Sequence, residues 1–256
     1  MGESAGGANR EVALIVGGGP GVSASCARLF AREGMAVAVA ARNPDKDVLT
    51  QLAAEHGVRL YTCDAAQPDA VEGLFEAVTR DLGAPRLVVH NIDGRMPDIF
   101  RKSIADADPA LALQVLQNSS YSAFLVGQQA ARAMLARDTE GDDHRGTVVF
   151  TNASASFKGY ANSAAFAMAC RAKAGLVESM GRELMPQGIH VVNVPIDAAI
   201  GWTREDGTRA HWLAGESTDD NMADPDRIAE LYLFLHRQHR STWTCEVVLR
   251  PWVENW

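Results

Sequence analysis

Long apolar runs, closely spaced cysteines and an excess of positive charge are all missing from this sequence of 256 residues. No apolar run approaches the roughly 20 residues that cross a bilayer, and the N-terminal residues lack the apolar centre of a signal peptide. The cysteines lie far apart, without the spacing of a metal site or a disulfide framework. We therefore expect reduced thiols, no bound metal and a cytoplasmic location. The cysteines are Cys26, Cys63, Cys170 and Cys245.

The formal net charge is −8, and the basic residues form no stripe along the sequence. Nucleic acid and anionic membrane are therefore not expected as partners, because both attract basic surfaces. Hydrophobic residues make up 47% of the chain and charged residues 22%, which suits a folded protein rather than a disordered one. The expected partner is a small-molecule substrate.

Short β-branched runs alternate with longer segments of helical period along the whole sequence. This alternation is typical of repeated βαβ units and of a parallel sheet. It predicts an α/β protein with a single-domain Rossmann fold, in which a doubly wound, seven-stranded parallel sheet carries helices on both faces. We expect residues 1–10 to form a flexible tail and residues 11–256 to form the domain. The predicted strands are 12–16, 36–40, 59–61, 87–90, 147–151, 190–194 and 246–249, and the predicted helices are 21–33, 45–56, 69–82, 109–136, 160–185 and 225–237.

A glycine-rich run follows the first predicted strand and opens the first predicted helix. Glycines there permit a tight turn and let backbone amides approach a pyrophosphate at the positive end of the helix. Isolated glycines also mark ordinary turns, but the strand-turn-helix setting favours a dinucleotide site. The residues expected to bind the phosphates are Gly17, Gly19, Gly21 and Val22.

The same run resembles the Thr-Gly-x-x-x-Gly-x-Gly loop of short-chain dehydrogenases/reductases, with Val16 in place of the threonine and Ser23 in place of the last glycine. Later segments extend the resemblance over nearly the whole chain. Asp64 and Ala65 follow the third strand, where the family has an aspartate that contacts adenine, and Asn91 matches the family's Asn-Asn-Ala-Gly stretch. The resemblance implies an oxidoreductase with a nicotinamide dinucleotide as cofactor.

The residues after the second predicted strand favour NADP(H) over NAD(H). NAD-preferring relatives carry an acidic residue there, which holds the 2′-hydroxyl of the ribose. In this sequence Ala41 takes that place and is followed by Arg42 and Asn43. Because arginine offers a bidentate contact to a 2′-phosphate, we expect Arg42 and Asn43 to help bind NADP(H).

Four positions that carry catalysis in this family hold other residues here. The family uses a tyrosine, a lysine four residues later, a serine thirteen residues before the tyrosine, and an asparagine in the preceding long helix. The resemblance places Phe166, Cys170, Ala153 and Ser119 at these positions. Phenylalanine has no proton to exchange, so ordinary tyrosine-dependent ketone reduction is not expected. Lys173 is expected on another face of the helix, where it does not restore the pair.

Several polar side chains are candidates for the missing proton carrier. Asp197 is the best of them, because it follows the sixth predicted strand close to the expected nicotinamide position. A carboxyl in an apolar site can have a raised pKa and act as an acid or base. Ser154 and Tyr160 are further candidates, and Asp93 lies across the expected cleft. For each of them, hydrogen bonding to loop backbone is the alternative explanation.

A loop at about residues 199–218 matches the segment that covers the substrate in this family, and it carries His211 and Trp212. Three functions remain open. The first is a divergent reductase that transfers hydride from NADPH to an acceptor needing little acid help, such as an iminium or an activated C=C bond. The second is a non-redox catalyst, and the third is a silent protein that only binds NADP(H).

Small residues are frequent in the predicted helices 109–136 and 160–185. They let helices approach closely, and relatives pair these two helices across a two-fold axis. We therefore expect a homodimer or a homotetramer; the alternative is that the small residues serve packing against the sheet.

Overall fold

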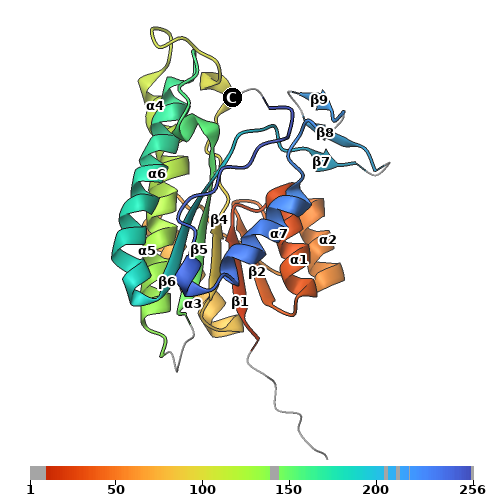
Figure 1. The fold of residues 1–256 in the computed structure, drawn as a ribbon, viewed down its shortest axis with the longest axis vertical. Helices are drawn as coiled ribbons and strands as arrows, with labels where there is room; N and C mark the ends of the chain where they lie inside the picture. The colour runs from red at the N-terminus through yellow and green to blue at the C-terminus, as the bar shows by residue number, and fades with distance from the viewer. Residues whose placement is uncertain (1–9, 139–143, 205–206, 212–213, 219, 255–256) are drawn as a thin grey trace, which may run out of the picture.

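The computed structural model describes residues 10–138, 144–204, 207–211, 214–218 and 220–254, so residues 1–9 of the expected tail lie outside it. Its centre is a six-stranded sheet in the order β3-β2-β1-β4-β5-β6, and every neighbouring pair is parallel. Helices cover both faces (Figure 1), which confirms the α/β Rossmann-like architecture. The strands are β1 (Val12–Val16), β2 (Ala36–Ala41), β3 (Arg59–Thr62), β4 (Leu87–His90), β5 (Gly146–Ala153) and β6 (Ile189–Ile196).

Side chains along the strands alternate between two apolar layers, as the two-residue repeat of a strand requires. Ala13 and Ile15 of β1 belong to the layer closed by α1, α2 and α7. Leu14 and Val16 belong to the layer closed by α3, α5 and α6. The helices of the two layers are α1 (Val22–Arg32), α2 (Asp47–His56), α7 (Pro225–His236), α3 (Pro68–Leu82), α5 (Ser122–Leu135) and α6 (Ala164–Leu184).

The seventh strand, expected at residues 246–249, is not formed. Only two isolated parallel bridges join this segment to β6, at Asn193 with Glu246 and at Ile196 with Leu249. Between them lies Pro195, whose carbonyl accepts from the Leu249 amide but which has no N–H to donate in return. The missing donor interrupts the ladder, so the sheet has six strands.

The long helix expected at 109–136 is divided in the structure. It consists of α4 (Pro109–Leu116), a π-helical turn (Gln117–Tyr121) and α5. The hydroxyl of Ser120 donates to the Leu116 carbonyl at 3.1 Å, and such bonds compete with the regular helical ladder. π-helical turns are frequent at functional sites, and this one lies beside the cleft described below.

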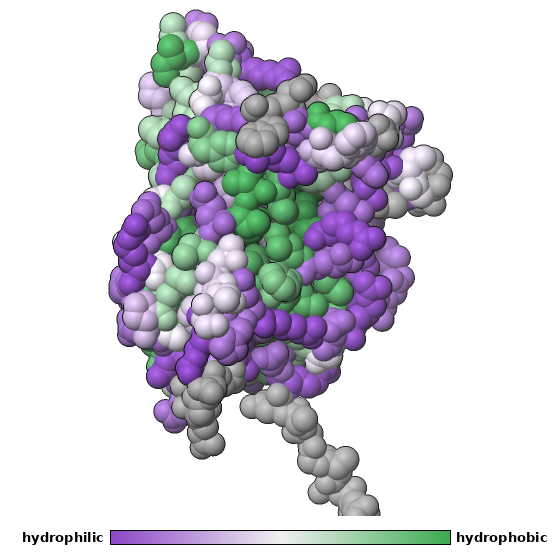
Figure 2. All heavy atoms as spheres, in the orientation of Figure 1, coloured by the Kyte–Doolittle hydropathy of each residue, from purple (hydrophilic) through white to green (hydrophobic). Residues whose placement is uncertain are grey.

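The molecular surface is apolar in places. On the face shown in Figure 2, apolar residues gather at the centre and hydrophilic residues surround them. Among the helices of the described ranges, none has the length and apolarity that a bilayer crossing requires.

Candidate active site

The loop between β1 and α1 leaves its backbone open to a ligand. Gly17 has φ +108°, and a Cβ there would lie 2.4 Å from the Asn91 carbonyl oxygen, so only glycine fits. Gly19 and Gly21 face open space where a Cβ would stand. Within the described residues, α1 begins at Val22 without a capping side chain or an acidic residue in its first turn. Its first amides can therefore bind an anion.

Ser23 occupies the third glycine position without closing this loop. Its buried hydroxyl donates to the Gly17 carbonyl at 2.7 Å and accepts from Nδ2 of Asn91 at 2.7 Å. These two bonds tie the end of β4 to the loop that follows β1. The side chain of Asn91 thus helps to fix the conformation of the glycine loop through Ser23.

Two cations mark one end of the cleft, in a cavity of about 240 Å³. Arg42 follows β2 as expected, and Lys46 stands four residues later, just before α2. The Lys46 ammonium donates to the Gly18 carbonyl at 3.2 Å, which places it beside the glycine loop. The lining of this cavity includes Ala41, Arg42, Lys46, Asp64, Ala65 and Asn91.

The sequence did not single out Lys46 as a cofactor-binding residue, whereas it did single out Asn43. The signal for Lys46 was its position, four residues after Arg42 at the start of the helix expected at 45–56. Asn43 does not line the cavity; its Oδ1 accepts from the Asp45 amide at 3.0 Å and closes a turn. Asn43 therefore shapes the chain that carries Arg42 and Lys46.

A second cavity, of about 410 Å³, continues the cleft along the carboxyl ends of the strands. Both cavities share the segment after β4, from Asn91 to Asp93, and also Arg95. The second cavity opens beside the glycine loop, with Gly19, Gly21 and Val22 in its wall. Ligands of open α/β sheets bind at this edge, so the two cavities form one extended ligand cleft.

Three of the four positions matched to catalytic residues lie in the wall of the second cavity. These are Ala153, Phe166 and Cys170. Burial raises the pKa of the Cys170 thiol to about 11, so this group is neutral at pH 7. Ser119 lies instead in the π-helical turn, buried against Gly94, and its hydroxyl has no hydrogen-bond partner among the described residues.

Lys173 reaches the cleft, and the expectation that it faces elsewhere is wrong. Its side chain is 1% exposed, and its ammonium donates to the carbonyls of Ile92 at 2.9 Å and Thr151 at 3.2 Å. Side chains on a helix lean toward its N-terminus, and the cleft lies at that end of α6, so a long side chain bridges the extra turn. Burial lowers the Lys173 pKa to about 8.

Charged groups face Lys173 from the other side of the cleft. Burial raises the pKa of the Asp93 carboxyl even though its side chain is still 51% exposed, and Arg95 pairs with it at 3.3 Å. The Arg95 guanidinium also lies 4.2 Å from the ring centre of Phe166. Burial lowers the pKa of His211, which lines the same cavity. Trp212, the other candidate of this loop, lies outside the described residues.

Asp197 is held as a carboxylate, contrary to the expected raised pKa. Its oxygen lies 2.6 Å from the Lys158 ammonium and 3.0 Å from Nε of Arg250. Burial alone would raise its pKa, but the hydrogen bonds from the two cations outweigh burial and lower it. Its neighbours Ile196 and Ala198 line the second cavity, whereas Asp197 does not.

Ser154 and Tyr160 belong to the same polar cluster as Asp197. Their hydroxyl oxygens are 3.2 Å apart, and Ser154 also hydrogen-bonds to the Asp197 carboxylate. The structure therefore brings together the three side chains that the sequence singled out. It places them beside the second cavity rather than in its wall.

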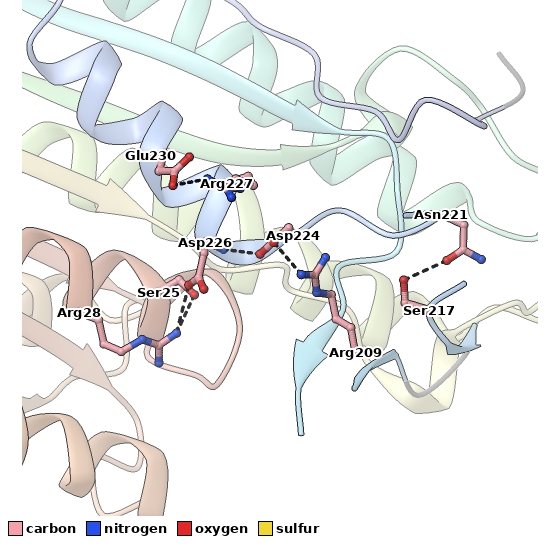
Figure 3. Close-up of polar contacts among 9 residues, drawn as sticks. All are labelled: Ser25, Arg28, Arg209, Ser217, Asn221, Asp224, Asp226, Arg227 and Glu230. Carbon is pink, nitrogen blue, oxygen red and sulfur yellow. Dashed lines mark hydrogen bonds and ion pairs between the residues drawn. The ribbon is translucent and has the colours of Figure 1, made fainter. Parts of the chain in front are cut away.

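The segment expected to cover the substrate forms a small antiparallel sheet of β7 (Trp202–Thr203), β8 (Arg209–His211) and β9 (Gly215–Glu216). Arg209 of β8 pairs with Asp224 at 2.7 Å, and Asp224 also caps the first turn of α7 (Figure 3). Trp202 and His211 project into the second cavity from this sheet. Of the contacts in Figure 3, the Arg209–Asp224 pair joins this small sheet to the start of α7.

Comparison with known proteins places this geometry in a family. Residues 18–249 match the family described as Enoyl-(Acyl carrier protein) reductase. The chain belongs to the short-chain dehydrogenase/reductase superfamily. A curated relative, (+)-cis,trans-nepetalactol synthase NEPS1 of Nepeta racemosa, is 25% identical over 88% of this chain and 83% of its own.

Solved structures of the superfamily share the fold. A short-chain dehydrogenase from Rhodopseudomonas palustris superposes with a TM-score of 0.76 and 28% identity, covering 95% of this chain and all of its own. A metagenomic short-chain oxidoreductase in complex with NADP superposes with a TM-score of 0.73 at 22% identity, covering 94% and 97% of the two chains. Both likenesses extend over nearly the full length of this chain.

Proposed function

We propose that this protein is an atypical, NADP(H)-dependent oxidoreductase that acts on a small organic substrate: a carbonyl, an imine or an activated C=C bond. The observation that carries the proposal is the extended cleft itself. It combines an open glycine loop with two cations at one end and a buried ammonium at the other. A dinucleotide bearing a 2′-phosphate has the length and charge to engage all three.

The residues of the first cavity suit the adenosine half of the cofactor. Asp64 with Ala65 would contact the adenine there, and the amides of Gly19, Gly21 and Val22, in the wall of the second cavity, would hold the pyrophosphate. Arg42 and Lys46 would hold the 2′-phosphate, since both cations line the first cavity and Asp45 between them does not. When bound, NADPH supplies a hydride at the other end of the cleft.

We infer that proton handling has moved away from the family's tyrosine. Phe166 stands at that position and has no exchangeable proton. Lys173 has three N–H donors and uses two of them on the carbonyls of Ile92 and Thr151, which leaves one for a ribose or substrate oxygen. At pH 7 an ammonium with a pKa of about 8 is mostly protonated, so Nζ of Lys173 can donate a proton into the cleft. Asp93 is the second candidate for this role, because its carboxyl lines the same cavity.

The alternative is a non-redox catalyst or a silent NADP(H)-binding protein on the same fold. The stacking of Arg95 on Phe166 supports it, because the wall at the tyrosine position then offers a cation and no acid. The test is hydride transfer from NADPH to pooled carbonyls, imines and enones. Turnover supports the oxidoreductase, and tight NADPH binding without turnover supports the alternative.

We also propose that the protein is a cytoplasmic homodimer or homotetramer with no nucleic-acid or membrane partner. Support comes from large apolar side chains on α4, the π-helical turn, α5 and α6 that are 43–56% exposed. Exposed apolar side chains gathered on one face are typical of interfaces. They are Leu113, Tyr121, Phe124 and Met168.

Phe124→Lys is expected to convert the oligomer into a monomer or smaller species at micromolar concentration. The phenyl ring is 44% exposed and stacks with Tyr121 at 6.4 Å between ring centres, and a two-fold axis would bring two lysines together. Light scattering measures the change. Phe234→Lys on α7, where the ring is 59% exposed, is the control and should leave the mass unchanged. A monomeric wild type contradicts the proposal.

A further inference from the structure

An apolar cavity of about 150 Å³ lies next to the cleft, between residues 95–107, α4 and the start of α6. Its walls include Met96, Ile99, Val115, Ala165 and Met168. A volume of about 150 Å³ has room for a benzene ring. The space therefore suits a phenyl group or a short alkyl chain.

Three cations line this apolar space, while the carboxylates Asp98 and Asp106 of the same segment lie outside its lining. The lining includes Arg95, Arg101 and Lys102, and it includes no carboxylate. The first turn of α6 adds to this charge, because its N-cap residue Ser163 makes no capping side-chain bond within the described residues and no acidic residue follows. An anionic group at the mouth of the cavity would meet several positive partners at once.

The backbone around the cavity is held in an unusual conformation. Arg101 and Asn162, which both line the cavity, have φ values of +60° and +58°. This left-handed region is tolerated by asparagine and is uncommon for arginine. Strained residues of this kind cluster at ligand sites, where the surrounding structure enforces them.

Arg95 and Phe166 form a wall that the apolar cavity shares with the second cavity of the cleft. Arg95 already pairs with Asp93 at 3.3 Å, but the two side chains are 35% and 51% exposed. An ion pair that open to solvent contributes little, so an incoming carboxylate can compete for the guanidinium. A ligand held there would touch both cavities.

We propose that the apolar cavity binds the hydrocarbon end of an organic carboxylate about the size of a phenylalkanoate, with the carboxylate paired to Arg95. That this ligand is the substrate of the cleft rests on the proposed function, whereas its binding does not. The rest of such a molecule would extend past Phe166 toward Lys173. The hydrocarbon end and the reactive carbon of the ligand would thus lie on opposite sides of the wall formed by Arg95 and Phe166.

Calorimetric titration with 3-phenylpropanoate and with its neutral amide, 3-phenylpropanamide, tests the site. We expect the acid to bind about tenfold to a hundredfold more tightly, which is the usual effect of a charge-assisted hydrogen bond. Arg95→Met should reduce the affinity for the acid to that of the amide. Ala107→Phe, which fills the cavity, should weaken both ligands, and Arg32→Met at the far end of α1 is the matched control.

The proposal is overturned if acid and amide bind equally or if Arg95→Met changes nothing. Binding of the acid that NADPH still displaces in the Arg95→Met variant would overturn it as well, because the acid would then occupy the cations Arg42 and Lys46. Affinity that falls as protein concentration rises would show that a second copy of the chain fills the cavity. NADPH is titrated separately: its failure to bind, with acid binding intact, contradicts the proposed function alone.

Discussion

Between pH 8 and pH 10.5, the wild-type protein is expected to gain about 3 kcal/mol of stability relative to a Lys173→Met variant. The cause is the buried ammonium of Lys173, whose pKa falls from 10.5 to about 8 in the folded protein. Denaturant unfolding of both proteins at several pH values measures the difference.

The sign follows from proton binding. Below pH 8 the lysine is charged in both states, and the folded protein bears the cost of burying the charge. Between the two pKa values the unfolded chain binds more protons than the folded protein, so stability rises with pH. Above pH 10.5 the lysine is neutral in both states and the penalty has gone.

Lys102→Met removes an exposed ammonium and supplies the baseline for this comparison. Parallel pH profiles of the wild type and Lys173→Met would show that the Lys173 ammonium is not desolvated. If Nζ of Lys173 carries the proton, Lys173→Met should also lower any turnover of NADPH about a hundredfold or more. A loss of that size is the usual effect of removing a general acid. Unchanged turnover would leave Asp93 as the remaining candidate.

NADPH is expected to bind about tenfold to a hundredfold more tightly than NADH to the wild-type protein. A single charge-assisted contact contributes about 1.5–3 kcal/mol, which corresponds to that ratio. Arg42→Ala should remove most of the difference, and the double variant Arg42→Ala/Lys46→Ala should bind both cofactors equally. The preference should also weaken as salt rises, because both cations stand in an open cavity.

Quenching of protein fluorescence by each cofactor measures these affinities. Arg182→Ala, on α6 where the side chain is 74% exposed and outside both cavities of the cleft, is the control and should keep the preference. Equal affinities in the wild type would contradict the assignment of Arg42 and Lys46 to a 2′-phosphate. Loss of NADH binding together with NADPH binding in Arg42→Ala would instead indicate a damaged cleft.

Most of the sheet could be predicted from the sequence, because buried parallel strands give short apolar runs that glycine and polar turns delimit. The second strand was expected at 36–40 and spans Ala36–Ala41. The seventh strand does not form because Pro195 of β6 has no N–H to donate to residues 246–249, which lie far along the chain. The proline is visible in the sequence, but its pairing partner is not.

The candidate site divides in the same way. The glycine loop and Arg42 could be predicted because each follows its strand directly. Asp197 could not, since its pKa is lowered by Lys158 and Arg250, which lie 39 and 53 residues away along the chain. Lys173 was misjudged because the helical repeat was misapplied: it lies seven residues after Phe166 and three after Cys170, which puts all three on one face of α6.

Deuteride transfer from NADPH labelled at C4 of the nicotinamide most directly tests whether this cleft retains redox chemistry. The labelled cofactor is mixed with the wild-type protein and pooled carbonyls, imines and enones, and the products are weighed by mass spectrometry. We predict deuterium in at least one product, matched by NADP⁺ formed, and its loss in the Arg42→Ala/Lys46→Ala variant at the same cofactor concentration. NADPH binding without deuterium in any product, while a tyrosine-containing 3-oxoacyl reductase labels its product in the same mixture, would contradict the proposed oxidoreductase.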